Sequence, residues 1–80
     1  MAKVTLRLFA GAREIAGNGS IAYEASTVQD LLAQAQSDLG EEFTRILSIS
    51  RVWLNGEPVE GDSQISSGDE VAVLPPVSGG

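Results

Sequence analysis

The 80-residue sequence contains no cysteine and no histidine. Without cysteine the chain has no disulfides, no thiolate metal ligands and no cysteine nucleophile. Without histidine it lacks the most common general base and metal ligand of proteins. We therefore expect no metal site, no cofactor bound by the chain alone and no side-chain catalyst, so that the chain by itself is not catalytic.

Basic residues and long apolar runs are also scarce. Five Lys and Arg stand against eleven Asp and Glu, and the resulting net charge of −6 repels nucleic acid phosphates and anionic membrane surfaces. No stretch approaches the roughly 18 apolar residues of a membrane span, and the first residues lack the apolar run of a signal peptide. We expect a cytoplasmic protein that binds neither nucleic acid nor a membrane.

The apolar residues that are present, 42% of the chain, suit one small domain of the α+β class. Alternation of apolar and polar residues predicts strands over residues 4–9, 20–24, 51–54 and 70–74. A further extended segment is expected over residues 57–59, where Pro58 restricts the chain to a sheet edge or a strand start. The expected sheet is mixed and has four to five strands.

One main helix is expected to cover one face of this sheet. Ser26 or Thr27 is its expected N-cap and Gly40 ends it. Between them, apolar residues recur on a single helical stripe: Val28, Leu31, Leu32, Ala35 and Leu39. Residues 10–19 are expected to form a loop with up to one helical turn, and residues 41–50 a helical turn.

The last six residues differ in composition from the domain, which we place at residues 1–74. Two adjacent prolines, Pro75 and Pro76, favour an extended chain, so residues 75–80 are expected to project as a tail. Gly79 and Gly80 lack Cβ atoms and could enter a narrow channel in another protein. Chance, disordered termini and cloning scars also produce glycine pairs, so the composition alone leaves both interpretations open.

A terminal carboxylate on Gly80 would be ionised at pH 7 and therefore a poor electrophile. It would need activation, for example as an acyl-adenylate made from ATP by another enzyme. A sulfur nucleophile on a partner could then attack the carbonyl carbon. In this interpretation Gly80 carries the reacting group, and Gly79 permits close approach of the activating enzyme.

Several motifs together resemble the small, sulfur-carrying subunit of molybdopterin synthase, the MoaD type of the MoaD/ThiS ubiquitin-like superfamily. The resemblance covers essentially the whole chain. It rests on Leu8-Phe9-Ala10 with Arg13-Glu14, on Asn55-Gly56, on Gly68-Asp69-Glu70-Val71-Ala72 and on the ending Pro75-Pro76-Val77-Ser78-Gly79-Gly80.

This resemblance implies a ubiquitin-like β-grasp fold and a carrier cycle. A ubiquitin-activating-type adenylyltransferase would adenylate Gly80, sulfur transfer would give a thiocarboxylate, and the tail would enter the large synthase subunit. There the sulfur would pass to cyclic pyranopterin monophosphate during molybdenum cofactor biosynthesis, in a complex expected to be a heterotetramer.

The resemblance also implies partner contacts for residues that have structural interpretations. Phe9 and Leu74 are expected to anchor the large subunit, or else to pack locally. Arg13 could contact a partner, stay solvated or pair with Glu14. Pro58 could join the docking surface or only end an edge strand. The tail residues expected in the partner are Pro75, Pro76, Val77 and Ser78.

Three further positions have mainly structural interpretations. Trp53 is expected to pack on the sheet, with an interface role as the alternative. Asp69 and Glu70 are expected to stabilise a turn and not to act as a catalytic pair.

Two other functions stay open at this point. Related sulfur carriers for thiamin, cysteine or tRNA thiolation share the fold and the Gly-Gly end. A different class is a ubiquitin-like binding module whose Gly79-Gly80 ending is incidental or is conjugated to lysines.

Overall fold

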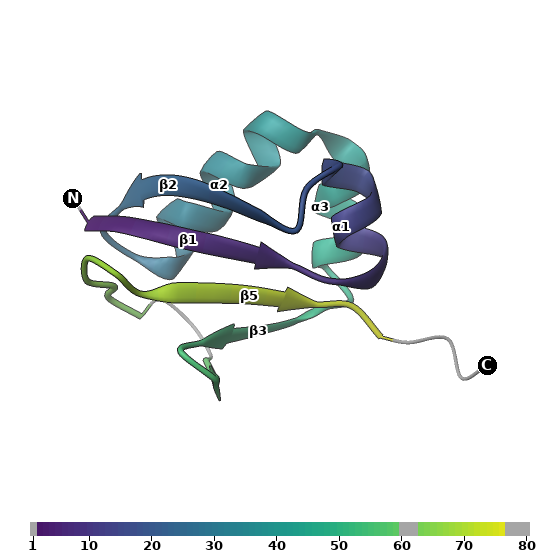
Figure 1. The fold of residues 1–80 in the computed structure, drawn as a ribbon. Coiled ribbons are helices and arrows are strands. Elements are labelled where there is room, and N and C mark those ends of the chain that lie inside the picture. Colours follow the sequence, from purple (N-terminus) through teal and green to yellow (C-terminus); the bar gives the residue numbers. More distant parts are fainter. Residues whose placement is uncertain (1, 60–62, 77–80) are drawn as a thin grey trace.

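The computed structural model describes residues 2–59 and 63–76. They form a mixed five-stranded sheet of order β2-β1-β5-β3-β4 (Figure 1). β1 and β5, in the centre, are parallel, and the other pairs are antiparallel. The elements in chain order are β1 (Ala2–Leu8), α1 (Ala10–Ala16), β2 (Ser20–Ala25), α2 (Val28–Leu39), α3 (Glu41–Leu47), β3 (Arg51–Leu54), β4 (Glu57–Pro58) and β5 (Glu70–Leu74).

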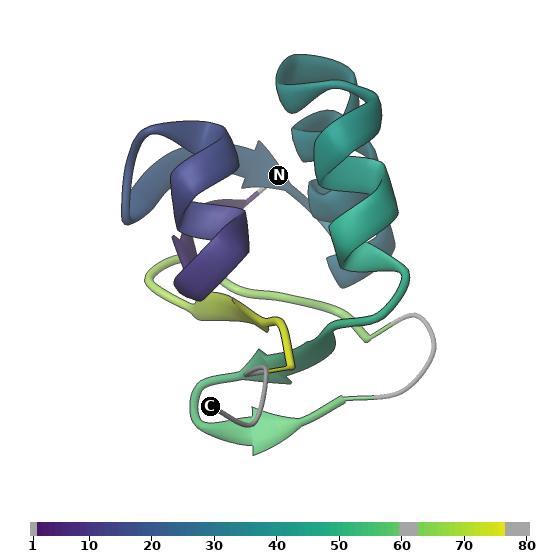
Figure 2. The same cartoon turned by 90° about the vertical axis from the view of Figure 1, so that its right-hand side faces the viewer.

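All three of these helices lie on one face of the sheet, and no helix of the described residues covers the other face, called the uncovered face below (Figure 2). Alternate residues of the central strands therefore point into the core while their neighbours point to the uncovered face. The fully buried side chains include Leu6, Leu8, Val71 and Val73 from the strands and Phe43 from α3. The expected α+β architecture is confirmed, but three helices cover the sheet where one main helix was expected.

The segment expected to be a loop is the helix α1, two turns long. Ala12 is completely buried against the sheet, and Gly17, with φ of 74°, ends the helix in the left-handed conformation. The alternation that suggested a strand through Phe9 ends one residue earlier, because Phe9 is the N-cap of α1. Within residues 41–50, where a helical turn was expected, the structure has the seven-residue helix α3, from Glu41 to Leu47.

The main helix α2 has the predicted boundaries. Thr27 is its N-cap, and the Thr27 hydroxyl accepts a hydrogen bond of 3.1 Å from the backbone N–H of Asp30. Val28, Leu31 and Ala35 are buried, as the apolar stripe predicts. Gly40, with φ of 86°, separates α2 from α3.

Side-chain hydrogen bonds join the β3–β4 turn to the residues before β5. The Asn55 amide donates to Asp69 Oδ1 at 3.0 Å, and the Ser66 backbone N–H donates to Asp69 Oδ2 at 2.7 Å. Both bonds lower the pKa of Asp69, and the bond from Ser66 has the larger effect. Asp69 and Glu70 therefore stabilise a turn, as expected, since the Glu70 backbone N–H in turn donates to Asn55 Oδ1 at 2.9 Å.

Asp69→Asn is expected to lower the melting temperature at neutral pH. A folded-state pKa below the unfolded value gives stability that is present above the unfolded pKa, about 3.9, and is lost as the pH falls through the folded pKa. The difference in melting temperature between wild type and variant should thus shrink between about pH 5 and pH 2. Glu57→Gln is the control, because the Glu57 carboxylate makes no hydrogen bond with the described residues. A difference independent of pH would contradict the prediction.

Candidate functional site: the uncovered sheet face and the base of the tail

The uncovered face carries a row of side chains across four strands. In the register of the sheet, Arg7 pairs with Ala72, Ala72 with Trp53, and Trp53 with Pro58. Directly paired residues project from the same side of a sheet, so these four side chains share the face that no helix covers. Trp53 is half-buried and Pro58 is exposed.

A second row lies toward the end of the sheet at which the tail begins. Leu74 pairs with Arg51, and since Leu8 is level with Val73, the next residue, Phe9, is level with Leu74. Phe9 is 39% exposed although it is a large apolar side chain, and the Arg7 guanidinium carbon lies 5.8 Å from its ring centroid. That distance allows a cation–π interaction between the two side chains on the uncovered face.

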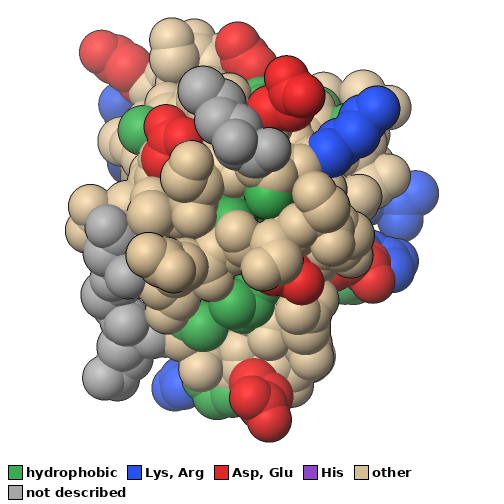
Figure 3. All heavy atoms as spheres, turned by 90° about the vertical axis from the view of Figure 1, so that its left-hand side faces the viewer, with side chains coloured by type: hydrophobic (Ala, Val, Ile, Leu, Met, Phe, Trp, Pro, Cys, Tyr) green, Lys and Arg blue, Asp and Glu red, His purple; other side chains and the backbone are tan. Residues whose placement is uncertain are grey.

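We call the apolar residues of this surface the docking face: Phe9, Trp53, Pro58, Ala72 and Leu74. Exposed apolar side chains gathered on one face make this surface the candidate interaction site. At the opposite end of the domain, hydrophobic side chains form only small patches interrupted by polar and charged groups (Figure 3).

Charged groups border the docking face. The Arg7 guanidinium forms an ion pair of 3.2 Å with Glu70, and both side chains are about half exposed, at 52% and 51%. An exposed pair of this kind contributes little to stability, so Arg7 and Glu70 remain available to a partner. Arg51 is exposed next to Leu74.

The tail leaves the domain beside Phe9. β5 is parallel to β1, so both strands end on the same side of the sheet (Figure 1). The Pro75 side chain is buried, and Pro76 is the first exposed residue after β5. Pro75 is therefore packed at the base of the tail, and its expected contact with a partner stays a prediction. Val77, Ser78, Gly79 and Gly80 lie outside the described residues.

The structure brings three of the eight predicted contact residues together on the docking face. Phe9, Pro58 and Leu74 share the docking face. Arg13 lies elsewhere, on α1, with its guanidinium near Gly19, and the described residues contain no ion pair between Arg13 and Glu14. Arg7 and Ala72 were not among the predicted residues, although the alternation that placed Phe9 and Leu74 on one face also places them there.

Neither metal chemistry nor a membrane span is indicated in the described residues. Residues 2–59 and 63–76 contain no group of three Asp or Glu side chains arranged to hold a metal ion. Within the same residues, none of the helices has the length and apolar character needed to cross a bilayer.

The sheet order, the helices on a single face and the strand that leads into the C-terminal tail define a ubiquitin-like β-grasp domain. The ThiS family matches residues 6–80 of this chain, and the chain therefore belongs to that family. The predicted membership of the MoaD/ThiS superfamily and the predicted β-grasp fold are both confirmed. No curated protein matches the sequence.

Solved structures agree with this assignment. SAMP1 from Haloferax volcanii is 28% identical with a TM-score of 0.87, covering 99% of this chain and 100% of that one. The putative molybdopterin converting factor, subunit 1, from Pyrococcus furiosus is 27% identical with a TM-score of 0.83, covering 96% and 100%. A complex of subunits 1 and 2 of the molybdopterin-converting factor from Helicobacter pylori contains a chain of the same fold, 24% identical with a TM-score of 0.77, covering 98% and 99%.

Proposed function

We propose that this chain is the sulfur-carrying subunit of a molybdopterin synthase. In this role Gly80 is adenylated and converted to a thiocarboxylate, and its sulfur is donated to cyclic pyranopterin monophosphate in the large subunit. The observation that carries the proposal is the ThiS family match, which extends to Gly80 and so includes the Gly79-Gly80 pair. The similarity to the Pyrococcus furiosus protein supports the molybdopterin route among those open to the family.

The geometry of the domain supports a carrier role. The docking face and the base of the tail lie on one side of the molecule, so one partner can hold the face while the tail enters its active site. Among the described residues, the two titratable groups with shifted pKa values are Tyr23 and Asp69, and neither is on the docking face. The chemistry is thus assigned to the chain end, and the folded domain supplies recognition.

The reaction needs two steps at the Gly80 carboxylate. Attack of one carboxylate oxygen on the α-phosphorus of ATP gives the acyl-adenylate and releases pyrophosphate. Hydrosulfide (HS⁻) released by a sulfur donor then adds to the carbonyl carbon, AMP leaves with the bonding electrons, and loss of the S–H proton to solvent gives the thiocarboxylate. The first step uses an adenylyltransferase as partner, and this chain contributes only the carboxylate and a narrow glycine backbone.

A second candidate is a protein modifier that is joined to lysine side chains through Gly80. The similarity to SAMP1, the small archaeal modifier protein 1, favours it. Both functions begin with the same adenylate and differ in the nucleophile that attacks it.

Mass spectrometry of the intact protein tests the proposal. After incubation with ATP, the adenylyltransferase and a sulfur donor, the mass should increase by the replacement of one oxygen by one sulfur at the C-terminus. Addition of the large subunit and cyclic pyranopterin monophosphate should return the original mass and produce molybdopterin. A thiocarboxylate that is made but never discharged by the large subunit would reject the molybdopterin route, and a branched lysine conjugate would support the modifier.

A further inference from the structure

A second surface, separate from the docking face, lies along strand β2. β2 is at one edge of the sheet, where its outer side pairs with no other described strand. Gly19 O accepts from Leu8 N on β1, while Glu24 O points outward and accepts from the Gln34 amide at 2.8 Å. Backbone groups alternate along an antiparallel strand, so those of Ser20, Ala22 and Glu24 face outward. Among these outward backbone groups, only Glu24 O has a hydrogen-bond partner in the described residues.

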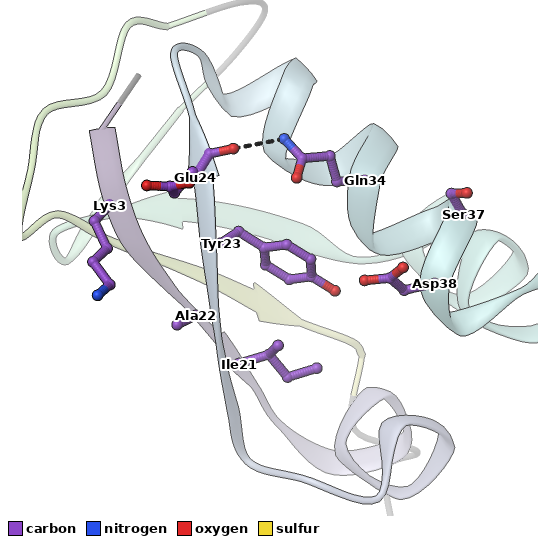
Figure 4. A pocket seen from close by; sticks show the side chains of 8 residues that line it. All are labelled: Lys3, Ile21, Ala22, Tyr23, Glu24, Gln34, Ser37 and Asp38. Carbon is purple, nitrogen blue, oxygen red and sulfur yellow. Dashed lines mark hydrogen bonds between the residues drawn. The ribbon is translucent and has the colours of Figure 1, made fainter.

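A groove of about 880 Å³ follows this edge between β2 and α2 (Figure 4). Ile21 and Tyr23 from β2 line one side, and Gln34, Ser37 and Asp38 from α2 line the other. An unpaired strand edge beside a groove with apolar side chains is the arrangement that binds an extended peptide as an additional strand.

A buried polar atom lies in the same groove. Tyr23 is only 9% exposed, and its hydroxyl has no hydrogen-bond partner among the described residues. The Tyr23 ring projects from β2 toward the Asp38 carboxylate on α2 (Figure 4). Burial raises the pKa of Tyr23 to about 12, and after it the Asp38 carboxylate contributes through hydrogen bonding and charge, so the two groups lie close together although their geometry falls short of a full hydrogen bond. A ligand N–H group placed beside this pair could donate to the Tyr23 oxygen and to the Asp38 carboxylate.

The charges of the groove select a basic ligand. Two acidic residues, Glu24 and Asp38, and one basic residue, Lys3, line the groove. Asp38 lies in the last turn of α2, which has no basic residue, and the carboxylate therefore adds to the negative end of the helix dipole. A cation placed beside Asp38 would be attracted both by its carboxylate and by the negative end of the helix dipole.

We propose that the β2 edge and its groove bind an extended segment of a partner protein by strand addition, with a lysine or arginine side chain of that segment directed to Asp38 and Tyr23. The backbone of the segment pairs with Ser20, Ala22 and Glu24, and its N–H group replaces the Gln34 amide at Glu24 O. A second copy of this chain is a poorer occupant, because each copy carries a net charge of −6.

The test uses the full chain labelled with ¹⁵N and a short capped peptide that alternates valine and lysine. On addition of the peptide, the amide signals of the labelled chain should shift at Ser20–Glu24 and at Gln34–Asp38. The amides of Ala22 and Glu24 should become protected from hydrogen exchange. The matched peptide of valine and glutamate should bind at least about tenfold more weakly. The valine and lysine peptide with N-methyl groups on alternate backbone nitrogens should lose binding, because it cannot pair with the edge.

Variants of the chain separate strand addition from general attraction to an acidic protein. Asp38→Asn should weaken binding of the lysine peptide about tenfold, since a charge-assisted hydrogen bond is lost. Glu57→Gln removes the same charge outside the groove and should leave the affinity unchanged. Ala22→Pro deletes an outward N–H without removing a bond of the sheet, and should weaken binding at least about fivefold.

Three results would overturn the proposal. One is the absence of shifts along Ser20–Glu24 at saturating peptide, and another is shifts confined to the docking face. The third is a dimer that protects the β2 amides without any peptide, which would make a second copy the occupant. If Ala22→Pro fails to fold, the N-methylated peptide decides the same point with the unaltered chain. Phe9→Asp should not change peptide binding, so failure of the proposed function leaves this test intact.

Discussion

Adding one residue after Gly80 is expected to abolish formation of the thiocarboxylate and all sulfur transfer. In the proposed cycle the reacting atom is the terminal carbonyl carbon of Gly80, and an added residue converts this carboxylate into an amide. An amide carbonyl has no free carboxylate oxygen to attack ATP, so no adenylate can form at Gly80, and the new terminal carboxylate lies one residue beyond the position of the reacting atom. Gly80→Trp should have the same effect for a steric reason, because the side chain cannot follow a glycine backbone into a narrow channel.

The thermal stability of these variants should equal that of the wild type. The hydrophobic core residues lie between Ala2 and Val73, so changes at residue 80 leave every core side chain in place. The matched control is a single residue added before Met1, which should leave thiocarboxylate formation intact. Melting curves and intact-protein mass spectra check both parts. Sulfur transfer by the extended chain would remove the basis of the proposed carrier function.

The elements that could be predicted from the sequence are those whose ends and faces are set locally. Thr27 and Gly40 mark the ends of α2, and the apolar stripe between them is sufficient to define its buried side. The strands alternate because one face of the sheet is covered and the other is not. The same alternation is sufficient to place Phe9 and Leu74 on the face opposite the buried side chains of their strands, and this is the uncovered face.

The elements that could not be predicted depend on tertiary contacts. The helix α1 has only seven residues and includes Gly11, and a helix this short is stabilised mainly by packing. That packing is close, since a Cβ atom on Gly11 would lie 2.6 Å from Ile46 Cδ1 of α3. Contact between α1 and α3 therefore favours a helix where local sequence favours a loop.

Two surface features could also not be predicted from the sequence: the burial of Pro75 and the groove at β2. Pro75 fixes an extended backbone whether its ring is buried or exposed, so the sequence does not reveal that the ring is buried. The groove at β2 needs Tyr23 and Asp38 to face one another, and no periodicity relates residues on a strand and on a later helix. Such pairs become visible only when the packing of α2 on the sheet is known.

Phe9→Asp is expected to weaken association with the large subunit of the synthase by at least about 30-fold. The Phe9 ring is the most exposed large apolar side chain of the docking face, at 39%, and it lies beside the base of the tail. A central aromatic residue of an interface typically contributes about 2 kcal/mol or more, and a carboxylate in its place must also be desolvated. Titration calorimetry with the isolated large subunit measures the change.

The fold should tolerate this substitution. Phe9 is the N-cap of α1, its backbone is extended (φ −127°, ψ 157°), and its side chain makes no capping hydrogen bond. Aspartate is favoured at an N-cap, so the variant should gain a cap while it loses an exposed ring. Ile49→Asp is the matched control, because Ile49 is an exposed large apolar residue, at 65%, that follows α3 on the helical side of the sheet. Equal losses of affinity for the two variants would show that the docking face is not the interface.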